Sequence, residues 1–238
     1  MGGLLSVFAG GFSVEKFLAS LISSAIVIFI TLPIHEFAHG FAAGKLGDPT
    51  ARYSGRLSLN PKAHLDPMGA LMVLFMGVGW ARPVPVDSRY FANPKRDMAL
   101  TAFAGPLSNL LLAFVSMLIG NAIGFSTFFV SNLVVYNILN FILTVFWYIA
   151  VINVSLAIFN LVPIPPLDGS KILAAFLPDR LYYRLMQYER FFSLILFALI
   201  FFSTRFSNVL SKMVSGVVGV FNWVTWLPFE AILKAIFN

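Results

Sequence analysis

Long runs of apolar residues separated by short polar loops are the main feature of the chain. The first long run covers residues 17–32, and nothing after it stops a helix, so we predict that one helix continues to about residue 44, with a kink at Pro33. Residues 99–123 and 133–161 form two further runs, each longer than the roughly 20 residues that cross a bilayer. The pattern therefore predicts three membrane-crossing helices.

Three other apolar segments are shorter or less hydrophobic. Residues 68–80 are too few to cross a bilayer, and the prolines of the following residues 81–86 favour extended backbone. We predict a re-entrant or interfacial element here, paired with short strands. Residues 191–203 and 214–229 are two further candidate helices. The sequence leaves open whether both span, because the tryptophans of the second also suit the headgroup region.

Basic residues gather in three polar loops, at residues 45–67, 87–97 and 171–190. The first of these loops is rich in turn-forming residues, and its residues 53–59 are predicted to be extended. Positively charged loops stay on the cytoplasmic side of a membrane, so all three are predicted to face the cytoplasm. The first helix and the helix of residues 133–161 then end in the same leaflet.

The composition supports an all-α polytopic membrane protein. Of the 238 residues, 59% are hydrophobic and 11% are charged, and the mean hydropathy is +0.86. No charged residue or histidine lies between Asp97 and Asp168. The net charge of +6 sits in short loops, which indicates topology signals and lipid headgroup contacts rather than nucleic-acid binding. Because the chain has no cysteine, disulfides, thiolate metal sites and a cysteine nucleophile are excluded.

His35, Glu36 and His39 form the most informative group of polar residues. On a helix, histidines four apart project from one face and can share a metal ion, with the glutamate beside them. Zinc in hydrolytic sites takes three protein ligands and leaves a fourth position for water. We predict Asp168 as the third ligand, because it follows the helix that ends in the same leaflet. His64 remains the alternative, although hydrogen bonding at the interface also suits it.

Glu36 is predicted to be the catalytic base, since the residue next to the first histidine points off the shared face and reaches the attacking water. The side-chain amide of Asn160 is a candidate donor to the oxyanion of the transition state. A histidine in an apolar helix is usually a packed core residue. However, an ionisable group near the bilayer centre costs about 2.5–3.5 kcal/mol, so a group of three favours a functional metal site.

Several motifs along the chain resemble those of the site-2 protease group of intramembrane zinc metalloproteases, in its short prokaryotic form. They are His35-Glu36-x-x-His39-Gly40, Ser58-Leu-Asn60-Pro61, His64-x-Asp66-Pro67, Gly79-Trp80-Ala-Arg-Pro83-Val-Pro85-Val, Asn93-Pro94-x-Arg96-Asp97, Ala104-Gly105-Pro106-x-x-Asn109 and Asn160-x-x-Pro163-x-x-x-x-Asp168-Gly169. The resemblance implies a three-helix catalytic core, zinc held by His35, His39 and Asp168, and hydrolysis of peptide bonds within or near transmembrane segments of single-span membrane proteins.

We predict one membrane domain over residues 1–238, with the catalytic core at about residues 15–170 and C-terminal helices at about residues 180–238. Residues 1–12 lack a basic n-region, so a cleaved signal peptide is not expected. The chain leaves no room for the PDZ or CBS domain that many relatives carry, and nothing in it indicates an oligomeric state. A membrane metal transporter and a metal-binding scaffold are the alternatives. A transporter would place further polar groups along its crossings.

Overall fold

The computed structural model describes residues 4–9, 12–178, 180–181 and 188–237, and among these it contains helices and irregular segments but no strand. Parts of residues 1–12 and of the basic loop at 171–190 lie outside the described residues. The elements, in chain order, are α1 (Leu4–Ala9), α2 (Val14–Ile26), η1 (Val27–Thr31), α3 (Leu32–Lys45), α4 (Thr50–Tyr53), α5 (Pro61–His64), α6 (Pro67–Met76), η2 (Ser88–Tyr90), α7 (Pro94–Ser126), η3 (Thr127–Phe129), α8 (Leu133–Asn160), α9 (Asp168–Ala174), α11 (Glu189–Phe202) and α12 (Thr204–Phe237).

Four helical stretches are long and apolar enough to cross a membrane, and they make the chain a multi-pass membrane protein. They are Val14–Lys45, Pro94–Phe129, Leu133–Asn160 and Thr204–Ile236. The first three confirm the predicted crossings. The second crossing extends beyond the expected residues 99–123 at both ends. The third begins at Leu133 as expected, where the Asn132 side chain accepts the backbone N–H groups of Val134 and Val135.

The first crossing is one continuous helix that contains a π-helical turn, η1, just before Pro33. Pro33 has no N–H to donate to the carbonyl four residues earlier, so the regular α-helical pattern fails at this point. The Leu32 amide donates instead to the carbonyl of Val27, five residues back. The helix thus absorbs the proline without ending, which keeps the histidines of α3 on the membrane-crossing helix.

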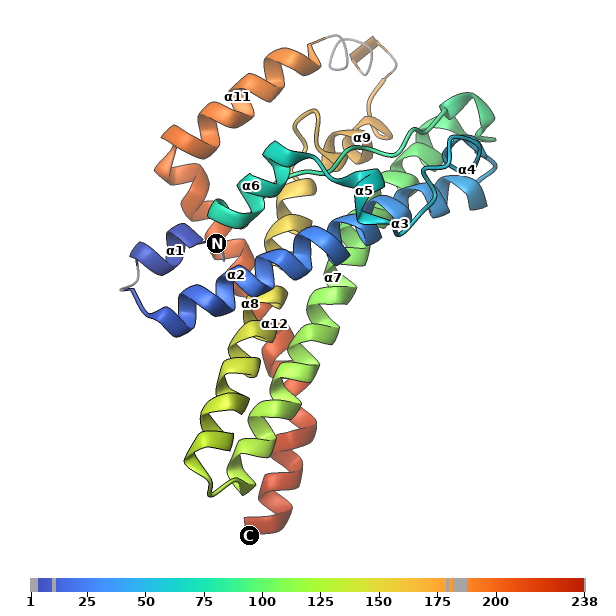
Figure 1. The fold of residues 1–238 in the computed structure, drawn as a ribbon. Coiled ribbons are helices and arrows are strands. Elements are labelled where there is room, and N and C mark those ends of the chain that lie inside the picture. Colours follow the sequence, from blue (N-terminus) through green and yellow to red (C-terminus); the bar gives the residue numbers. More distant parts are fainter. Residues whose placement is uncertain (1–3, 10–11, 179, 182–187, 238) are drawn as a thin grey trace.

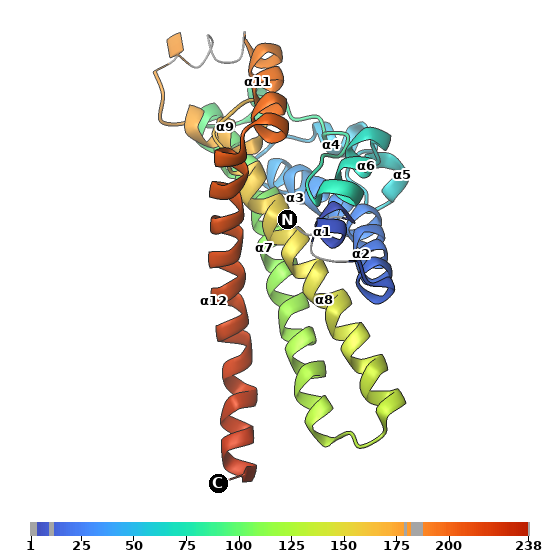
Figure 2. The ribbon, with the colours of Figure 1, turned by 90° about the vertical axis from the view of Figure 1, so that its left-hand side faces the viewer.

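Helices α7 and α8 form a hairpin, and the first crossing lies across both of them (Figure 1). The two helices of the hairpin approach closely at Gly124, where a Cβ would lie 2.9 Å from Cδ1 of Leu143 on α8. Helix α12 runs beside α7 and α8, as Figure 2 shows from the side. Helices α3 and α9 and the start of α7 meet at one end of the molecule (Figure 1).

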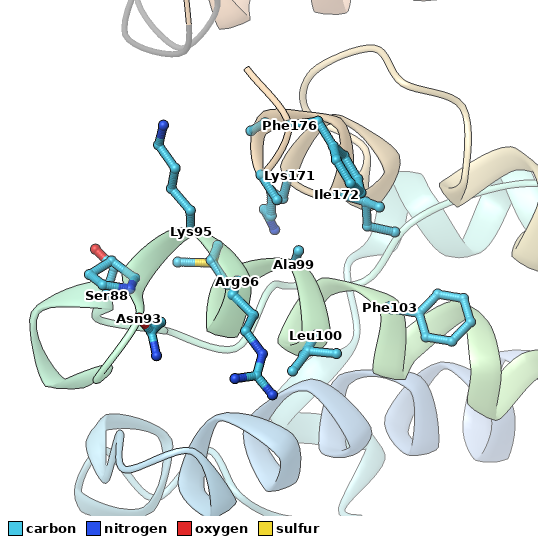
Figure 3. A pocket seen from close by; sticks show the side chains of 14 residues that line it. Ser88, Asn93, Lys95, Arg96, Ala99, Leu100, Phe103, Lys171, Ile172 and Phe176 are labelled. Carbon is cyan, nitrogen blue, oxygen red and sulfur yellow. The ribbon is translucent and has the colours of Figure 1, made fainter. Parts of the chain in front are cut away.

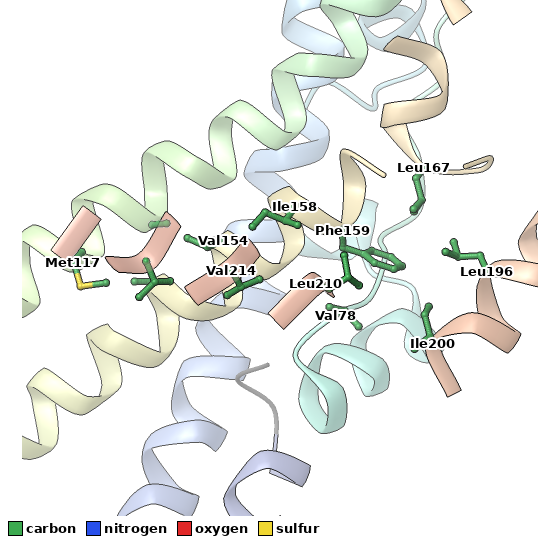
Figure 4. Close-up of a cluster of buried hydrophobic side chains, with 13 residues drawn as sticks. Val78, Met117, Val154, Ile158, Phe159, Leu167, Leu196, Ile200, Leu210 and Val214 are labelled. Carbon is green, nitrogen blue, oxygen red and sulfur yellow. The ribbon is translucent and has the colours of Figure 1, made fainter. Parts of the chain in front are cut away.

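The largest buried apolar cluster joins the hairpin to the C-terminal helices (Figure 4). Met117 of α7 and Val154 of α8 pack there with Leu210 and Val214 of α12. Leu196 of α11 completes the cluster beside the end of α8. Burying such side chains stabilises each by about 1.5–3 kcal/mol in water, and inside a membrane the gain comes from close packing.

Helix α12 contains the segment at residues 214–229, for which the sequence left open whether it spans. It has 34 residues, and Asn121 of α7 donates its Nδ2 to Oδ1 of Asn222 at 3.1 Å and to Oγ1 of Thr225 at 2.8 Å. A helix of spanning length that bonds to α7 along its side fits a crossing better than an interfacial position. The segment predicted at 191–203 is the 14-residue helix α11, which is shorter than a bilayer crossing.

In the polar loop after α3, residues 53–59 were expected to be extended. Tyr53 is instead the last residue of α4, and residues 54–59 form a turn and an irregular segment. The stretch at 68–80 contains the ten-residue helix α6, which Gly77 ends in the left-handed conformation (φ +73°). Gly69 of α6 packs against the carbonyl of Trp80, where any Cβ would clash. This contact holds the irregular segment 81–86 beside α6, and no strand pairs with it among the described residues.

Candidate metal centre

Two histidines of α3 face each other across one helical turn. His35 and His39 are four residues apart, so both side chains leave the same face of the helix. Both are buried, and their Nε2 atoms lie 3.0 Å apart. The rings meet edge to face, with 4.6 Å between their centroids. Both Nε2 atoms are therefore directed toward a common point beside α3.

Asp168 brings a carboxylate to the same point from a distant part of the chain. It is the first residue of α9 and is buried. Its Oδ2 lies 3.4 Å from Nε2 of His35 and 3.2 Å from Nε2 of His39. The structure thus brings together the three residues that the sequence placed in one leaflet.

His64, the alternative third ligand, lies apart from this group. It is buried at the end of α5, and its Nε2 donates to the carbonyl of Ser58 at 2.7 Å. Among the described residues, the group able to hold a metal ion consists of His35, His39 and Asp168. His64 thus has the hydrogen-bonding role that the sequence analysis gave as its other interpretation.

The donor atoms fit a zinc ion. Nδ1 of His39 lies 2.7 Å from the carbonyl of Thr101, which can only accept, so Nδ1 carries the proton and Nε2 presents a lone pair. A lone pair 3.2 Å from a carboxylate oxygen is repelled by it unless a proton or a metal ion lies between the two atoms, so the arrangement suits a shared metal ion. The donor separations of 3.0–3.4 Å match the roughly 3.3 Å expected between ligands of tetrahedral zinc with bonds of about 2.0–2.1 Å. Three protein ligands leave one position for water.

The charge of Asp168 is stabilised by its surroundings. Burial alone would raise its pKa, but His39 and His35 on one side and Lys171 on the other hold the pKa of Asp168 well below its usual range. Nζ of Lys171 lies 3.4 Å from Oδ1, the oxygen that does not face the histidines. The carboxylate is therefore ionised at neutral pH, as a metal ligand must be.

Two glycines provide the space in which these side chains meet. A Cβ at Gly105 of α7 would lie 2.7 Å from Cε1 of His35 and would also clash with the ring of His39. Gly169 packs against the carbonyl of Leu161, which brings the start of α9 against the end of α8. A larger residue at either position would displace a donor of the metal site.

Glu36 lines the same cavity, which has a volume of about 410 Å³. The carboxylate is buried beside the two histidines, and its Oε2 accepts the backbone N–H of Val84 at 2.8 Å. Val84 belongs to the segment 81–86, of which Ala81, Pro83, Val84 and Val86 line the cavity. The glutamate is therefore oriented by backbone from outside its own helix.

Asn160, the last residue of α8, also lines this cavity. Its Nδ2 donates to the carbonyl of Leu156 at 3.0 Å, which uses one of the two amide protons. The second proton remains for a group inside the cavity.

Sequence reasoning missed the supporting residues of the site. Thr101 and Val84 act through their backbone, so their side chains give no signal. Gly105 lies in a quoted motif, but the contact of this glycine with the histidine rings depends on how α7 crosses α3. Lys171 was assigned only to a basic loop, although its position three residues after Asp168 on a helix places the two charges side by side.

Comparisons with known proteins agree with this site. A model of peptidase family M50 matches residues 23–204 of the chain. The chain is 37% identical over 204 residues to YwhC of Bacillus subtilis, which is named as a candidate zinc metalloprotease; the match covers 80% of this chain and 85% of that protein. Rip2 of Mycolicibacterium smegmatis, with the same kind of name, is 27% identical over 149 residues, which are 59% of this chain and 51% of Rip2. No solved structure matches the chain significantly.

The family match extends over most of the chain, and it includes both α3 with its paired histidines and α9 with Asp168. The buried donor set and the names of the relatives agree on the metal, which is zinc. On these grounds the chain belongs to peptidase family M50, the site-2 protease family of membrane zinc metalloproteases.

Proposed function

We propose that the protein is an intramembrane endopeptidase that hydrolyses peptide bonds within or near the transmembrane segments of single-span membrane proteins, as in regulated intramembrane proteolysis. The position of the metal site supports this proposal. His35 and His39 lie within the apolar helical stretch Val14–Lys45, which is long enough to cross a membrane. A metal site on such a helix can act on a substrate that reaches it from the bilayer.

We also propose that the site faces the cytoplasmic leaflet. The polar loop that holds α4 and α5, the start of α7 and the helix α9 gather at one end of the molecule (Figure 1). Basic residues are concentrated in these elements, among them Arg52, Lys62, Lys95, Arg96 and Lys171. Basic loops stay in the cytoplasm, so this end is assigned to the cytoplasmic side.

In the proposed mechanism His35, His39 and Asp168 hold zinc, and Glu36 is the catalytic base. When bound, zinc is a Lewis acid that makes water more acidic and polarises the scissile carbonyl. Oε1 of Glu36 accepts a proton from the attacking water, because Oε2 already accepts the N–H of Val84. The glutamate then passes this proton to the amine that leaves. The second amide N–H of Asn160 donates a hydrogen bond to the developing oxyanion.

The segment 81–86 is the proposed binding edge for an unwound substrate. A helical peptide bond is shielded by backbone hydrogen bonds, so the substrate must unwind before water can attack. An extended segment on the cavity wall can pair with the unwound backbone, as sheet edges do with peptides. The amides of Arg82 and Val84 are occupied by the His64 carbonyl and Glu36, whereas no hydrogen bond of the described residues uses the amide of Val86.

Glu36→Gln should abolish cleavage without removing zinc. Glutamine still accepts the Val84 N–H but cannot take a proton, and loss of a general base costs about 10²–10⁴-fold in rate. The measurement is zinc content of the detergent-purified protein together with cleavage of a panel of single-span substrates. Glu15→Gln, an exposed carboxylate near the start of the same crossing, is the control and should cleave normally. If the protein binds stoichiometric zinc but shows no cleavage that depends on Glu36, the transporter or scaffold alternative would be favoured.

Asp168→Asn should lower zinc affinity more than the roughly 10–100-fold that loss of a supporting residue costs, because it removes a charged donor. His64→Asn should leave zinc affinity within about threefold, since His64 bonds to Ser58 outside the site. Competition with a chelator measures both values on folded protein. The proposed ligand set is wrong if the His64 variant loses zinc and the Asp168 variant keeps it.

Val86→Pro should reduce the cleavage rate about 5–10-fold, the equivalent of one hydrogen bond of about 1 kcal/mol to the substrate backbone. Val86→Ala keeps the amide and should cleave at the normal rate. Zinc content of both variants should equal that of the unmodified protein, because Val86 is not one of the proposed ligands. Equal cleavage by the proline and alanine variants would rule out pairing at this position.

A further inference from the structure

An apolar cavity of about 320 Å³ lies beside the metal cavity. It is formed by α6 and the residues after it, the end of α8, the residues before α9 and the helix α11. Figure 4 shows that the side chains of Phe159, Leu167, Leu196 and Ile200 surround one space. Among the described residues that line this cavity, none is charged. The cavity therefore suits an apolar group.

The apolar cavity and the metal cavity are adjacent, because four residues line both of them: Gly79, Trp80, Pro166 and Leu167. Two of these residues belong to the segment that leads from α6 to residues 81–86, and the other two belong to the turn that leads from α8 to α9. The shared residues thus connect the apolar cavity to the proposed substrate-binding segment and to the third metal ligand.

Neighbouring residues of the chain face different cavities at two places. Leu167 lines the apolar cavity, and the next residue, Asp168, lines the metal cavity. Phe159 and Asn160 divide in the same way. Consecutive Cα atoms of a peptide are about 3.8 Å apart. A substrate whose scissile carbonyl reaches the metal therefore has the side chain of an adjacent residue close to the apolar cavity.

The volume of the apolar cavity fits one large side chain. A cavity of about 150 Å³ lined by leucine, isoleucine and phenylalanine already binds benzene, so about 320 Å³ accommodates a leucine or phenylalanine side chain. A substrate from the bilayer carries mainly apolar side chains, and at the metal cavity these would otherwise lie beside Glu36 and Asp168. Hydrolysis requires water there, so the apolar cavity offers such a side chain a place away from water.

A larger cavity, of about 850 Å³, also adjoins the metal cavity, since Met98 and Lys171 line both. It lies between the start of α7 and α9, and its lining includes Lys95 and Arg96, whose side chains point to opposite sides (Figure 3). Burying an apolar group beside charged side chains removes water from the charges, which costs free energy. The cavity of 320 Å³ is therefore the better site for a leucine or phenylalanine side chain.

We propose that the apolar cavity is a subsite that binds one leucine or phenylalanine side chain of the substrate, from a residue directly next to the scissile bond. The inference rests on the proposed endopeptidase function and adds a preference among substrates. Leu196 and Ile200 are four residues apart on α11, so both project from one face of this helix into the cavity. No described residue of α11 lines the metal cavity. Helix α11 therefore sets the size of the subsite independently of the metal centre.

A series of substrates tests this subsite. The series is built on one single-span membrane protein whose cleaved bond has been mapped, and the residue on each side of that bond is replaced in turn by alanine, leucine, phenylalanine and tryptophan. At one of the two positions, leucine and phenylalanine should be cleaved with a kcat/KM at least about tenfold above that of alanine. One methylene group in a hydrophobic pocket is worth about 10–200-fold.

Substitutions of Leu196 should change this preference in opposite directions. Leu196→Phe fills the cavity and should lower the leucine-over-alanine ratio of kcat/KM to about threefold or less, whereas Leu196→Ala enlarges it and should raise tryptophan relative to leucine about tenfold. Loss of folded protein lowers all rates together, so it cannot produce opposite changes of these ratios. Leu210 of α12 belongs to the same buried cluster but does not line the cavity, so Leu210→Phe and Leu210→Ala should leave both ratios unchanged.

The outcomes separate the subsite from the proposed function. If no substrate of the series shows cleavage that depends on Glu36, the proposed function is wrong and the inference falls with it. Cleavage that depends on Glu36 but shows no preference for leucine would overturn the inference alone, as would a preference that the Leu196 and Leu210 variants change equally or not at all. If Leu196→Phe loses a phospholipid that the unmodified protein retains in native mass spectrometry, while the ratios stay the same, the cavity holds an acyl chain and the inference is wrong.

Discussion

The meeting of three electron-pair donors in a buried space is the constraint on which the rest of the structure depends. Two imidazole nitrogens and a carboxylate oxygen lie 3.0–3.4 Å apart, and a carbonyl at Thr101 takes the proton of one ring away from the centre. Such donors repel one another unless a cation joins them. A metal bound by these three residues would therefore connect α3 and α9, which are far apart in the sequence.

The elements around this centre support it with backbone groups and with close packing at glycines, in addition to side chains. Helix α7 offers a glycine face and a backbone carbonyl, and the turn between α8 and α9 uses Gly169 for close packing. The segment after α6 offers the amide of Val84. In a membrane the backbone is usually satisfied inside helices, so backbone groups that serve a site have to come from helix contacts and irregular segments that line a cavity.

Much of the fold and the centre of the site could be predicted because they depend on local patterns. The crossings follow from long uncharged runs, and the spacing of His35 and His39 needs only helical periodicity. Asp168 followed from topology, since two helices ending in one leaflet bring their ends together. The contacts of Gly105 and Val84 could not be predicted, because they depend on crossing angles and on the course of an irregular segment. The position of α12 likewise depended on Asn222, whose partner lies on a helix a hundred residues earlier.

The hydrogen bond between Val84 and Glu36 has a consequence for how the enzyme responds to its substrate. The segment 81–86, which lines the cavity, and the carboxylate of Glu36 are joined by one hydrogen bond of 2.8 Å. A ligand that bound the segment and shifted it would also reorient the carboxylate, and by thermodynamic reciprocity the state of the carboxylate would alter the affinity of the segment for that ligand. In the proposed mechanism, recognition of the substrate and proton transfer by Glu36 are therefore coupled through a single backbone amide.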